Sequence, residues 1–298
     1  MAKKKKRLRT DRLILVIIGL VVVIGLVIGG IFLLKDHKKR NTDTALDASN
    51  NQETETKTGI EALYYYEPEN QARYEAYQAL HPELAEEDVV WMVNVHLDEE
   101  PYTNLQVIPE SEENNEVLLV NKHYCYRDEF EPAELVETQN GKLVTPNTKT
   151  AYEKMVADAK AEGITGISAA STYRSIDYQV GLYNRYVERD GVAAADAYSS
   201  RPASSEHHTG RTIDLMGPDG TLESFESTKA CTWVHANAYK YGFIIRYEQG
   251  YEDITGYQYE PWHITYVGVE ASTTMHDEGI HTLEEYYAKY VQHQPTQS

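Results

Sequence analysis

The segments Ser204-Ser-Glu-His-His-Thr-Gly-Arg-Thr-Ile-Asp214 and Glu260-Pro-Trp-His263 decide the fold and the chemistry of this chain. Together they offer two imidazoles and one carboxylate for a single metal ion: His207, Asp214 and His263. A catalytic zinc has three protein ligands and an open fourth position, whereas a structural zinc closes all four. Glu260 stays outside this set, so it is available as a general base for the attacking water. The pattern predicts a zinc hydrolase.

The spacing within the first segment supports the same interpretation. Six residues, including Gly210, separate His207 from Asp214. Glycine permits a tight turn, and a hairpin-like reversal there would aim both side chains at one point. Taken alone, the segment is equally consistent with a solvated loop at His207 and His208 and a turn capped by Asp214. The second motif, with His263 just before a predicted strand, favours the metal site.

The N-terminus predicts where the protein is located. Residues 13–34 carry no charge over 22 positions, which is long enough to span a bilayer as a helix. Seven basic residues precede this segment and four follow it. This asymmetry favours a cytoplasmic N-terminus and an extracellular C-terminal domain. The alternative, a cleaved signal peptide, is disfavoured because the apolar run is too long and lacks a clear small-x-small cleavage site.

The charge of the chain agrees with this division. Residues 41–298 contain 17 basic and 45 acidic side chains, a net charge of −28. Such a domain would be repelled by nucleic acid and by anionic lipid, so the sequence predicts no nucleic-acid partner. The membrane partner is then the N-terminal helix alone.

The pattern along the chain predicts an α+β fold. We expect helices over residues 87–95, 147–161, 177–188 and 226–241, and strands over 117–120, 164–171, 243–247 and 264–267. Short strands without regular β-α repetition favour α+β over a doubly wound sheet. The predicted organisation is a basic tail (1–12), a membrane anchor (13–34), a stalk or linker (35–82), a catalytic domain (83–291) and a short tail (292–298).

The two cysteines, Cys125 and Cys231, leave an alternative open. In an extracellular domain they could pair, but two buried free thiols are at least as consistent with the sequence. Cys231 and His235 stand four residues apart on a predicted helix, and therefore on one face. Their surroundings have ordinary core spacing, so a Cys–His catalytic pair is disfavoured.

The motifs resemble those of the zinc D-alanyl-D-alanine carboxypeptidases of the VanY-like type, which trim bacterial cell-wall peptides. The family pattern Ser-x-His-x-x-Gly-x-Ala-x-Asp is matched from Ser205 to Asp214, with Thr212 in place of the alanine. Glu-x-Trp-His is matched from Glu260 to His263, and Tyr-Arg-Ser, followed by a glutamine, from Tyr173 to Gln179. The resemblance covers about residues 83–270. It implies a small mixed or antiparallel sheet with flanking helices, as in hedgehog and D-Ala-D-Ala peptidase domains.

The resemblance also implies roles for individual residues. One Zn²⁺ would be bound by His207, Asp214 and His263, with Glu260 as the base. Arg174 would stabilise the oxyanion or bind the terminal carboxylate of a peptidoglycan stem peptide, although a structural salt bridge is the alternative. Substrate contacts are expected from a further set: Ser205, Gln179, Tyr173 and Trp262. His208 stands where the family commonly has glutamine, and it is not expected to bind the metal.

Competing functions differ in the motifs that they require. A serine D,D-peptidase needs Ser-x-x-Lys and a zincin needs His-Glu-x-x-His, and the sequence contains neither. An LD-carboxypeptidase acting on tetrapeptide stems and a non-catalytic wall-binding module on the same fold remain open. Because selectivity depends on pocket shape, the sequence does not separate D,D from L,D specificity.

Overall fold

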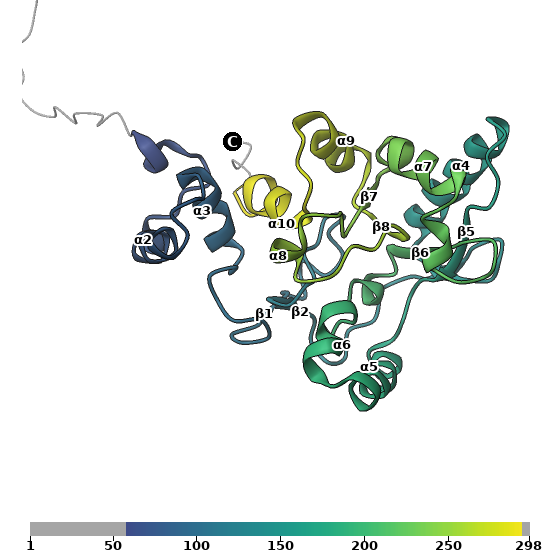
Figure 1. Ribbon diagram of the computed structural model, residues 1–298, viewed down its shortest axis with the longest axis horizontal. Helices are drawn as coiled ribbons and strands as arrows, with labels where there is room; N and C mark the ends of the chain where they lie inside the picture. The colour runs from purple at the N-terminus through teal and green to yellow at the C-terminus, as the bar shows by residue number, and fades with distance from the viewer. Residues whose placement is uncertain (1–57, 294–298) are drawn as a thin grey trace, which may run out of the picture. The chain divides into compact units, whose positions relative to one another are not determined.

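A four-stranded antiparallel sheet carries both motifs in the computed structural model, which describes residues 58–293 (Figure 1). The strands lie in the order β5 (Ser168–Ser171), β6 (Thr212–Met216), β8 (His263–Tyr266) and β7 (Phe243–Ile245). The α+β class and the small antiparallel sheet are therefore confirmed. The predicted anchor at 13–34 and residues 294–298 of the predicted tail (292–298) lie outside the described residues. Within residues 58–293, no helix combines the length and the apolar character needed to cross a bilayer.

The register of β6 and β8 separates an apolar face of the sheet from a polar one. Ile213 lies opposite Ile264, and Asp214 lies opposite His263. Directly opposite residues of antiparallel strands share a face, and successive residues alternate between faces. The two isoleucines, both fully buried, therefore belong to the core side. Asp214 and His263 are brought side by side on the other.

Two helices cover the apolar face. Met155 and Ala159 of α4 (Pro146–Ala161) and Ala230 and Val234 of α7 (Lys229–Asn237) form one core with the sheet. The helix predicted at 226–241 is shorter in the structure: α7 ends at Asn237, and the 3₁₀ turn η5 (Ala238–Tyr241) follows. Gly242 then turns the chain with φ 89°, where a Cβ atom would lie 2.6 Å from the ring of Tyr266.

A helical pair follows β5 and leads to the first motif. Helix α5 (Ile176–Asp190) is capped at its N-terminus by Ser175, whose hydroxyl accepts a hydrogen bond from Tyr178 N at 3.1 Å. It is longer than the predicted 177–188 and packs against α6 (Val192–Tyr198). The chain then enters η3 (Glu206–Thr209), which joins this pair to β6.

The predicted stalk (35–82) contains helices, whereas the helix predicted at 87–95 is confirmed close to its bounds. Residues 59–94 form η1 (Gly59–Ala62), η2 (Pro68–Asn70), α2 (Gln71–Leu80) and α3 (Glu86–Asn94). They share a core with α9 (Val269–Glu278), α10 (Leu283–Tyr286) and the π-helical turn η6 (Tyr287–Val291). Tyr65 and Tyr74 are buried there, and Asn94 bonds to both, at 2.6 Å each. The compact unit thus includes the elements from η1 onward, well before the predicted boundary at 83.

Short elements complete the domain. They are β1 (Gln106–Val107) parallel to β2 (Tyr124–Cys125), β3 (Val136–Glu137) antiparallel to β4 (Leu143–Val144), η4 (Glu223–Phe225) and α8 (Glu252–Thr255). The strand predicted at 117–120 is absent from this part of the described chain. Leu119 packs into the core of the N-terminal helices, whereas Leu118 and Val120 pack into a smaller cluster. The side chains of the apolar run 117–120 are therefore buried in two different clusters, although this segment pairs with no other strand in the described chain.

Candidate active site

Three predicted metal ligands converge on the polar face of the sheet. His207 comes from η3, Asp214 from β6 and His263 from the start of β8, and one ligand atom of each lies within 4.8 Å of the others. Gly210, with φ 67°, ends η3 and directs the chain into β6. The sequence predicted the reversal at this glycine but not the strand that follows it. This strand places Asp214 opposite His263.

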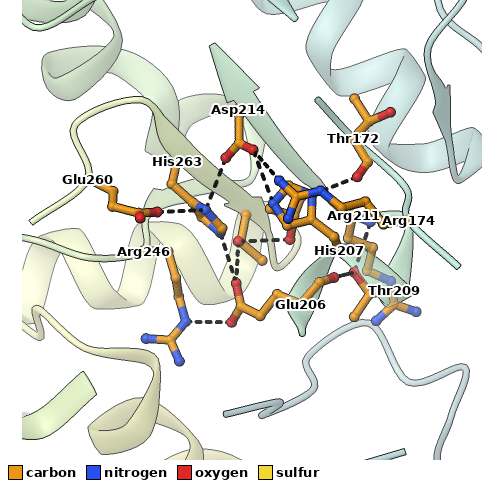
Figure 2. Close-up of polar contacts among 12 residues, drawn as sticks. Thr172, Arg174, Glu206, His207, Thr209, Arg211, Asp214, Arg246, Glu260 and His263 are labelled. Carbon is orange, nitrogen blue, oxygen red and sulfur yellow. Dashed lines mark hydrogen bonds and ion pairs between the residues drawn. The ribbon is translucent and has the colours of Figure 1, made fainter. Parts of the chain in front are cut away.

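The two imidazoles present different nitrogens to Asp214 (Figure 2). His207 Nδ1 lies 2.6 Å from the carbonyl oxygen of Thr172, and its Nε2 lies 3.2 Å from Asp214 Oδ2. His263 instead directs Nδ1 to Asp214 Oδ1, at 3.1 Å. Asp214 Oδ1 is buried, and although His263 Nδ1 lies 3.1 Å away, it forms no hydrogen bond of regular geometry with the residues described. Because buried polar atoms are normally paired, this donor set of two imidazoles and a carboxylate fits a metal ion such as zinc.

The electrostatics of these groups are also those of a cation site. Burial lowers the pKa of His263, but the neighbouring carboxylates of Asp214, Glu206 and Glu260 outweigh it and raise the pKa well above its usual value. Burial would raise the pKa of Asp214, whereas His207 and His263 hold it well below its usual value. The surrounding carboxylates therefore favour a positive charge at this point.

Glu260 lies beside the three candidate ligands. Its Oε2 is 3.2 Å from His263 Nδ1, and the residue is only 8% exposed. Burial raises the pKa of Glu260, and its contact with His263 opposes that shift. A buried carboxylate with a raised pKa is suited to accept and return a proton near neutral pH.

Arg174 is held in place by three polar side chains. Its Nη2 donates to Asp214 Oδ2 at 2.9 Å and its Nε to Ser171 Oγ at 3.0 Å, while Nη1 lies 3.5 Å from Gln179 Oε1. The predicted structural salt bridge is therefore present, but it is made to a candidate metal ligand. Arg174 also lines the cleft, so an ion pair and a substrate contact are compatible at this position.

The predicted substrate residues fall into two groups. A cleft of about 420 Å³ opens over the site, and Ser205 and Trp262 line it together with Arg174 and Glu260. Gln179 is fully buried and donates to the Ser200 carbonyl at 2.7 Å. Neither Gln179 nor Tyr173 is among the described residues that line the cleft. Gln179 thus supports Arg174 from behind, which differs from the predicted substrate contact.

Other cleft residues were not predicted from the sequence. Leu182, Tyr186 and Arg189 of α5 form one wall, and Tyr247 and Tyr257 contribute another part of the lining. The α5 residues recur at i, i+4 and i+7, which places them on one helix face. This spacing could have indicated from the sequence that the three side chains share one face of the helix. Glu206 was also missed: it lies between two motif residues, and its buried carboxylate faces His263 (Figure 2).

The other histidine and cysteine candidates are not part of the proposed metal site or of a catalytic pair. His208 is buried with Nδ1 2.7 Å from the carbonyl of Arg174, and burial lowers its pKa to about 4. It does not belong to the candidate ligand group. Cys125 and Cys231 are both buried free thiols. Burial raises the pKa of Cys231 to about 11, and His235 Nε2 lies 3.0 Å from the Pro261 carbonyl. These features disfavour a Cys–His catalytic pair.

Comparisons with known proteins agree with the site. The VanY D-alanyl-D-alanine carboxypeptidase family model matches residues 141–269, a range that contains Arg174, Glu260 and the three candidate ligands. A putative carboxypeptidase of Bacillus subtilis (strain 168), YodJ, is 38% identical over 187 residues, which cover 59% of this chain and 68% of that protein. This chain belongs to the VanY-like D-alanyl-D-alanine carboxypeptidase family.

Further relatives extend the comparison. A D-alanyl-D-alanine carboxypeptidase of Enterococcus faecium is 32% identical over 183 residues, covering 57% of this chain and 56% of that protein. The solved structure of the LdcB LD-carboxypeptidase, described as revealing the basis of peptidoglycan recognition, has a TM-score of 0.57 and 37% identity, covering 64% of this chain and 92% of LdcB. A mutant of the vancomycin-resistance D,D-pentapeptidase VanY, solved with Zn(II), has a TM-score of 0.50 and 29% identity, covering 57% and 98%.

Proposed function

We propose that this member of the family is a zinc carboxypeptidase that removes the C-terminal D-alanine from peptidoglycan stem peptides. One observation carries the proposal: His207, Asp214 and His263 lie within 4.8 Å of one another beside a cleft that is also lined by Glu260 and Arg174. Zinc bound by the three ligands would supply a Lewis acid that activates water and polarises the carbonyl of the scissile bond.

Glu260 and Arg174 have separate roles in the proposed reaction. The Glu260 carboxylate accepts a proton from the attacking water and returns it to the leaving amino group as the C–N bond breaks. Its position 3.2 Å from His263 Nδ1 places it beside the metal ligands. The Arg174 guanidinium, fixed by Asp214 and Ser171, presents its cleft side to the terminal carboxylate or to the developing oxyanion.

Two stem lengths are the candidate substrates. D,D-carboxypeptidase activity on pentapeptides and LD-carboxypeptidase activity on tetrapeptides are both candidates, because proteins of both kinds are similar to this chain. Full-length protein in detergent would be incubated with each stem peptide, and the products read by mass. We expect loss of one alanine from at least one of them. Chelator-treated protein is the control. A zinc-loaded protein that cleaves neither would favour the non-catalytic wall-binding module.

We also propose that the protein is a single-pass membrane protein with its catalytic domain outside the cell. The support is the uncharged segment 13–34 with its seven preceding and four following basic residues. Protease added to intact protoplasts should digest the domain and leave a small N-terminal fragment. Full protection of the domain would contradict this orientation.

A further inference from the structure

A buried acid, Glu206, lies directly behind one of the candidate metal ligands. It is 2% exposed, and its Oε2 accepts a hydrogen bond from Thr265 Oγ1 at 2.7 Å. The same oxygen lies 3.5 Å from Nε2 of His263. His263 directs its other nitrogen, Nδ1, to Asp214 and Glu260. The imidazole is thus placed between the cleft and the Glu206 carboxylate.

Glu206 is itself held by a buried ion network. The Arg246 guanidinium, fully buried, donates from Nε to Glu206 Oε1. From Nη1 and Nη2 it donates to Glu284 of α10, at 2.9 and 2.7 Å. Asn121 Nδ2 donates to the same Glu284 at 3.1 Å. The bidentate pair with Glu284 fixes the orientation of the Arg246 guanidinium. Glu206 is in turn held between Arg246 Nε and Thr265 Oγ1.

The charges of this network leave one negative charge uncompensated. Two carboxylates, Glu206 and Glu284, share one guanidinium. A buried charge without a partner is strongly destabilising. The group that can compensate the negative charge of Glu206 is the Nε2–H of His263. This N–H is more positively polarised when the other ring nitrogen is bound to a cation. Glu206 and the metal site therefore stabilise each other through a single imidazole ring.

The two histidine ligands are oriented by different acceptors. The Thr172 carbonyl accepts from His207 Nδ1 and leaves Nε2 toward the site. For His263 the arrangement is reversed, because Nε2 faces Glu206 and Nδ1 faces the site. Partners of the second ring nitrogen fix both the tautomer and the orientation of a metal-ligating histidine. A neutral histidine carries one N–H, so an acceptor at Nε2 would leave Nδ1 of His263 as the nitrogen available to a metal.

We propose that Glu206 is a positioning residue that accepts the Nε2–H of His263 and so commits Nδ1 of that ring to the metal. The inference rests on the proposed function, since it requires that His263 bind zinc. Arg246 holds Glu206 in place, and Glu284 holds Arg246. The C-terminal helix α10 is thereby linked to the metal site by a chain of buried ionic contacts (Figure 2 shows its inner part).

The test compares Glu206→Gln with Glu284→Gln in the full-length protein in detergent. Each variant replaces one of the two carboxylates that bind Arg246 with a neutral amide, so the melting temperatures of the two variants show whether either change acts through the general stability of the network. In Glu206→Gln, the amide oxygen is expected to keep the hydrogen bond from Arg246. The amide NH₂ group then faces His263 Nε2–H, and two donors oppose each other where the wild type has an acceptor. We expect zinc affinity, measured by competition with a chelator, to fall about 10–100-fold in Glu206→Gln. In Glu284→Gln it should change by less than about threefold.

The outcomes separate this inference from the proposed function. Wild-type zinc affinity in Glu206→Gln, or an equal loss in both variants, would overturn the positioning role. A wild-type protein that binds no zinc would overturn the proposed function, and this inference with it. Should Glu206→Gln not fold, long-range ¹H–¹⁵N spectra of the zinc-loaded wild type decide the matter. They should show His263 protonated at Nε2 and His207 at Nδ1. A His263 ring protonated at Nδ1 would overturn the inference.

Discussion

The two sides of the cleft hold their charges in different ways. On the sheet side, Asp214, His263 and the Glu206–Arg246 pair are buried, with side chains at most 6% exposed. On the helical side, Arg189 pairs with Asp190 and Arg201 with Asp196, and the two arginine side chains are 63% and 39% exposed. Buried networks are preorganised, and losing one partner is costly, whereas exposed pairs contribute little. Changes on the sheet side should therefore affect chemistry far more than changes on the helical side.

The largest effect is expected from the metal ligands. His263→Ala should remove most of the zinc and essentially all turnover, because only two of the three protein ligands remain. His208→Ala is the matched control, since His208 is buried one residue from His207 but bonds to the Arg174 carbonyl. Metal content and hydrolysis of stem peptide are the measurements. Loss of zinc in His208→Ala with retention in His207→Ala would mean that the ligand was assigned to the wrong histidine.

Glu260→Gln comes next. The glutamine keeps the size of the side chain but does not accept a proton, so turnover should fall by ~10²–10⁴-fold while zinc stays bound. Measuring metal content and peptide binding beside turnover distinguishes a base from a ligand. If zinc is lost together with activity, Glu260 is a ligand. Turnover near that of the wild type would exclude the base role.

Arg174→Lys should have an intermediate effect. Lysine keeps the charge but does not reach Ser171 and Asp214 together with a planar fork. We expect turnover to fall about 10²-fold with zinc retained, as for loss of one oriented donor. Amidation of the substrate's C-terminus should slow the wild type strongly. Equal cleavage of amidated and free peptides would indicate an endopeptidase and a different role for Arg174.

The same contrast explains what the sequence could predict. The donor types in the two motifs identified His207, Asp214 and His263, because metal chemistry restricts which residues are useful. Glu206 and Arg246 stand 40 residues apart, and such a long-range ion pair has no local signature. Gln179 was predicted at the substrate but is buried behind Arg174. Its motif position gave no indication of its bonds to Arg174 and Ser200, which are made between separate segments of the chain.

The helices and strands that could be predicted are those whose own sequence carries a clear periodicity or apolar run. Helix α4 and strand β8 were found close to their observed bounds because each has clear periodicity or an apolar run. Residues 59–80 were assigned to a stalk because this Tyr- and Glu-rich stretch was interpreted as a segment leading to the domain, whereas α3 was predicted at 87–95. Tyr65 and Tyr74 are buried only through tertiary contacts with α3 and the C-terminal helices. Those contacts are made between distant segments, which local sequence does not reveal.

The smallest effect is expected at the Asp196–Arg201 pair on the helical side. Burial would raise the pKa of Asp196, but the hydrogen bonds from Arg201 and Tyr183 outweigh it and lower the pKa below its usual value. A carboxyl whose folded-state pKa is lowered stabilises the fold above its unfolded-state pKa, near ~3.9, and loses that contribution as pH falls through the folded-state pKa. Asp196→Asn should therefore reduce the free energy of unfolding at pH 7 by at most ~1 kcal/mol, since the pair is partly exposed.

The pH dependence of that difference is the sharper measurement. Denaturant unfolding of wild type and Asp196→Asn should give values that converge as the pH is lowered below about 4, because the wild-type carboxyl then takes up its proton. Asp190→Asn is the comparison on the same side of the cleft: hydrogen bonds from Arg189 and Tyr198 also lower the pKa of Asp190, but Arg189 is 63% exposed, so the pH-dependent change in stability should be smaller than for Asp196→Asn. A gap between wild type and Asp196→Asn that stays constant down to about pH 2 would mean that Asp196 acts through packing or neutral hydrogen bonds. The helical side would then depend on the same preorganisation as the sheet side, and the distinction between the two sides would fail.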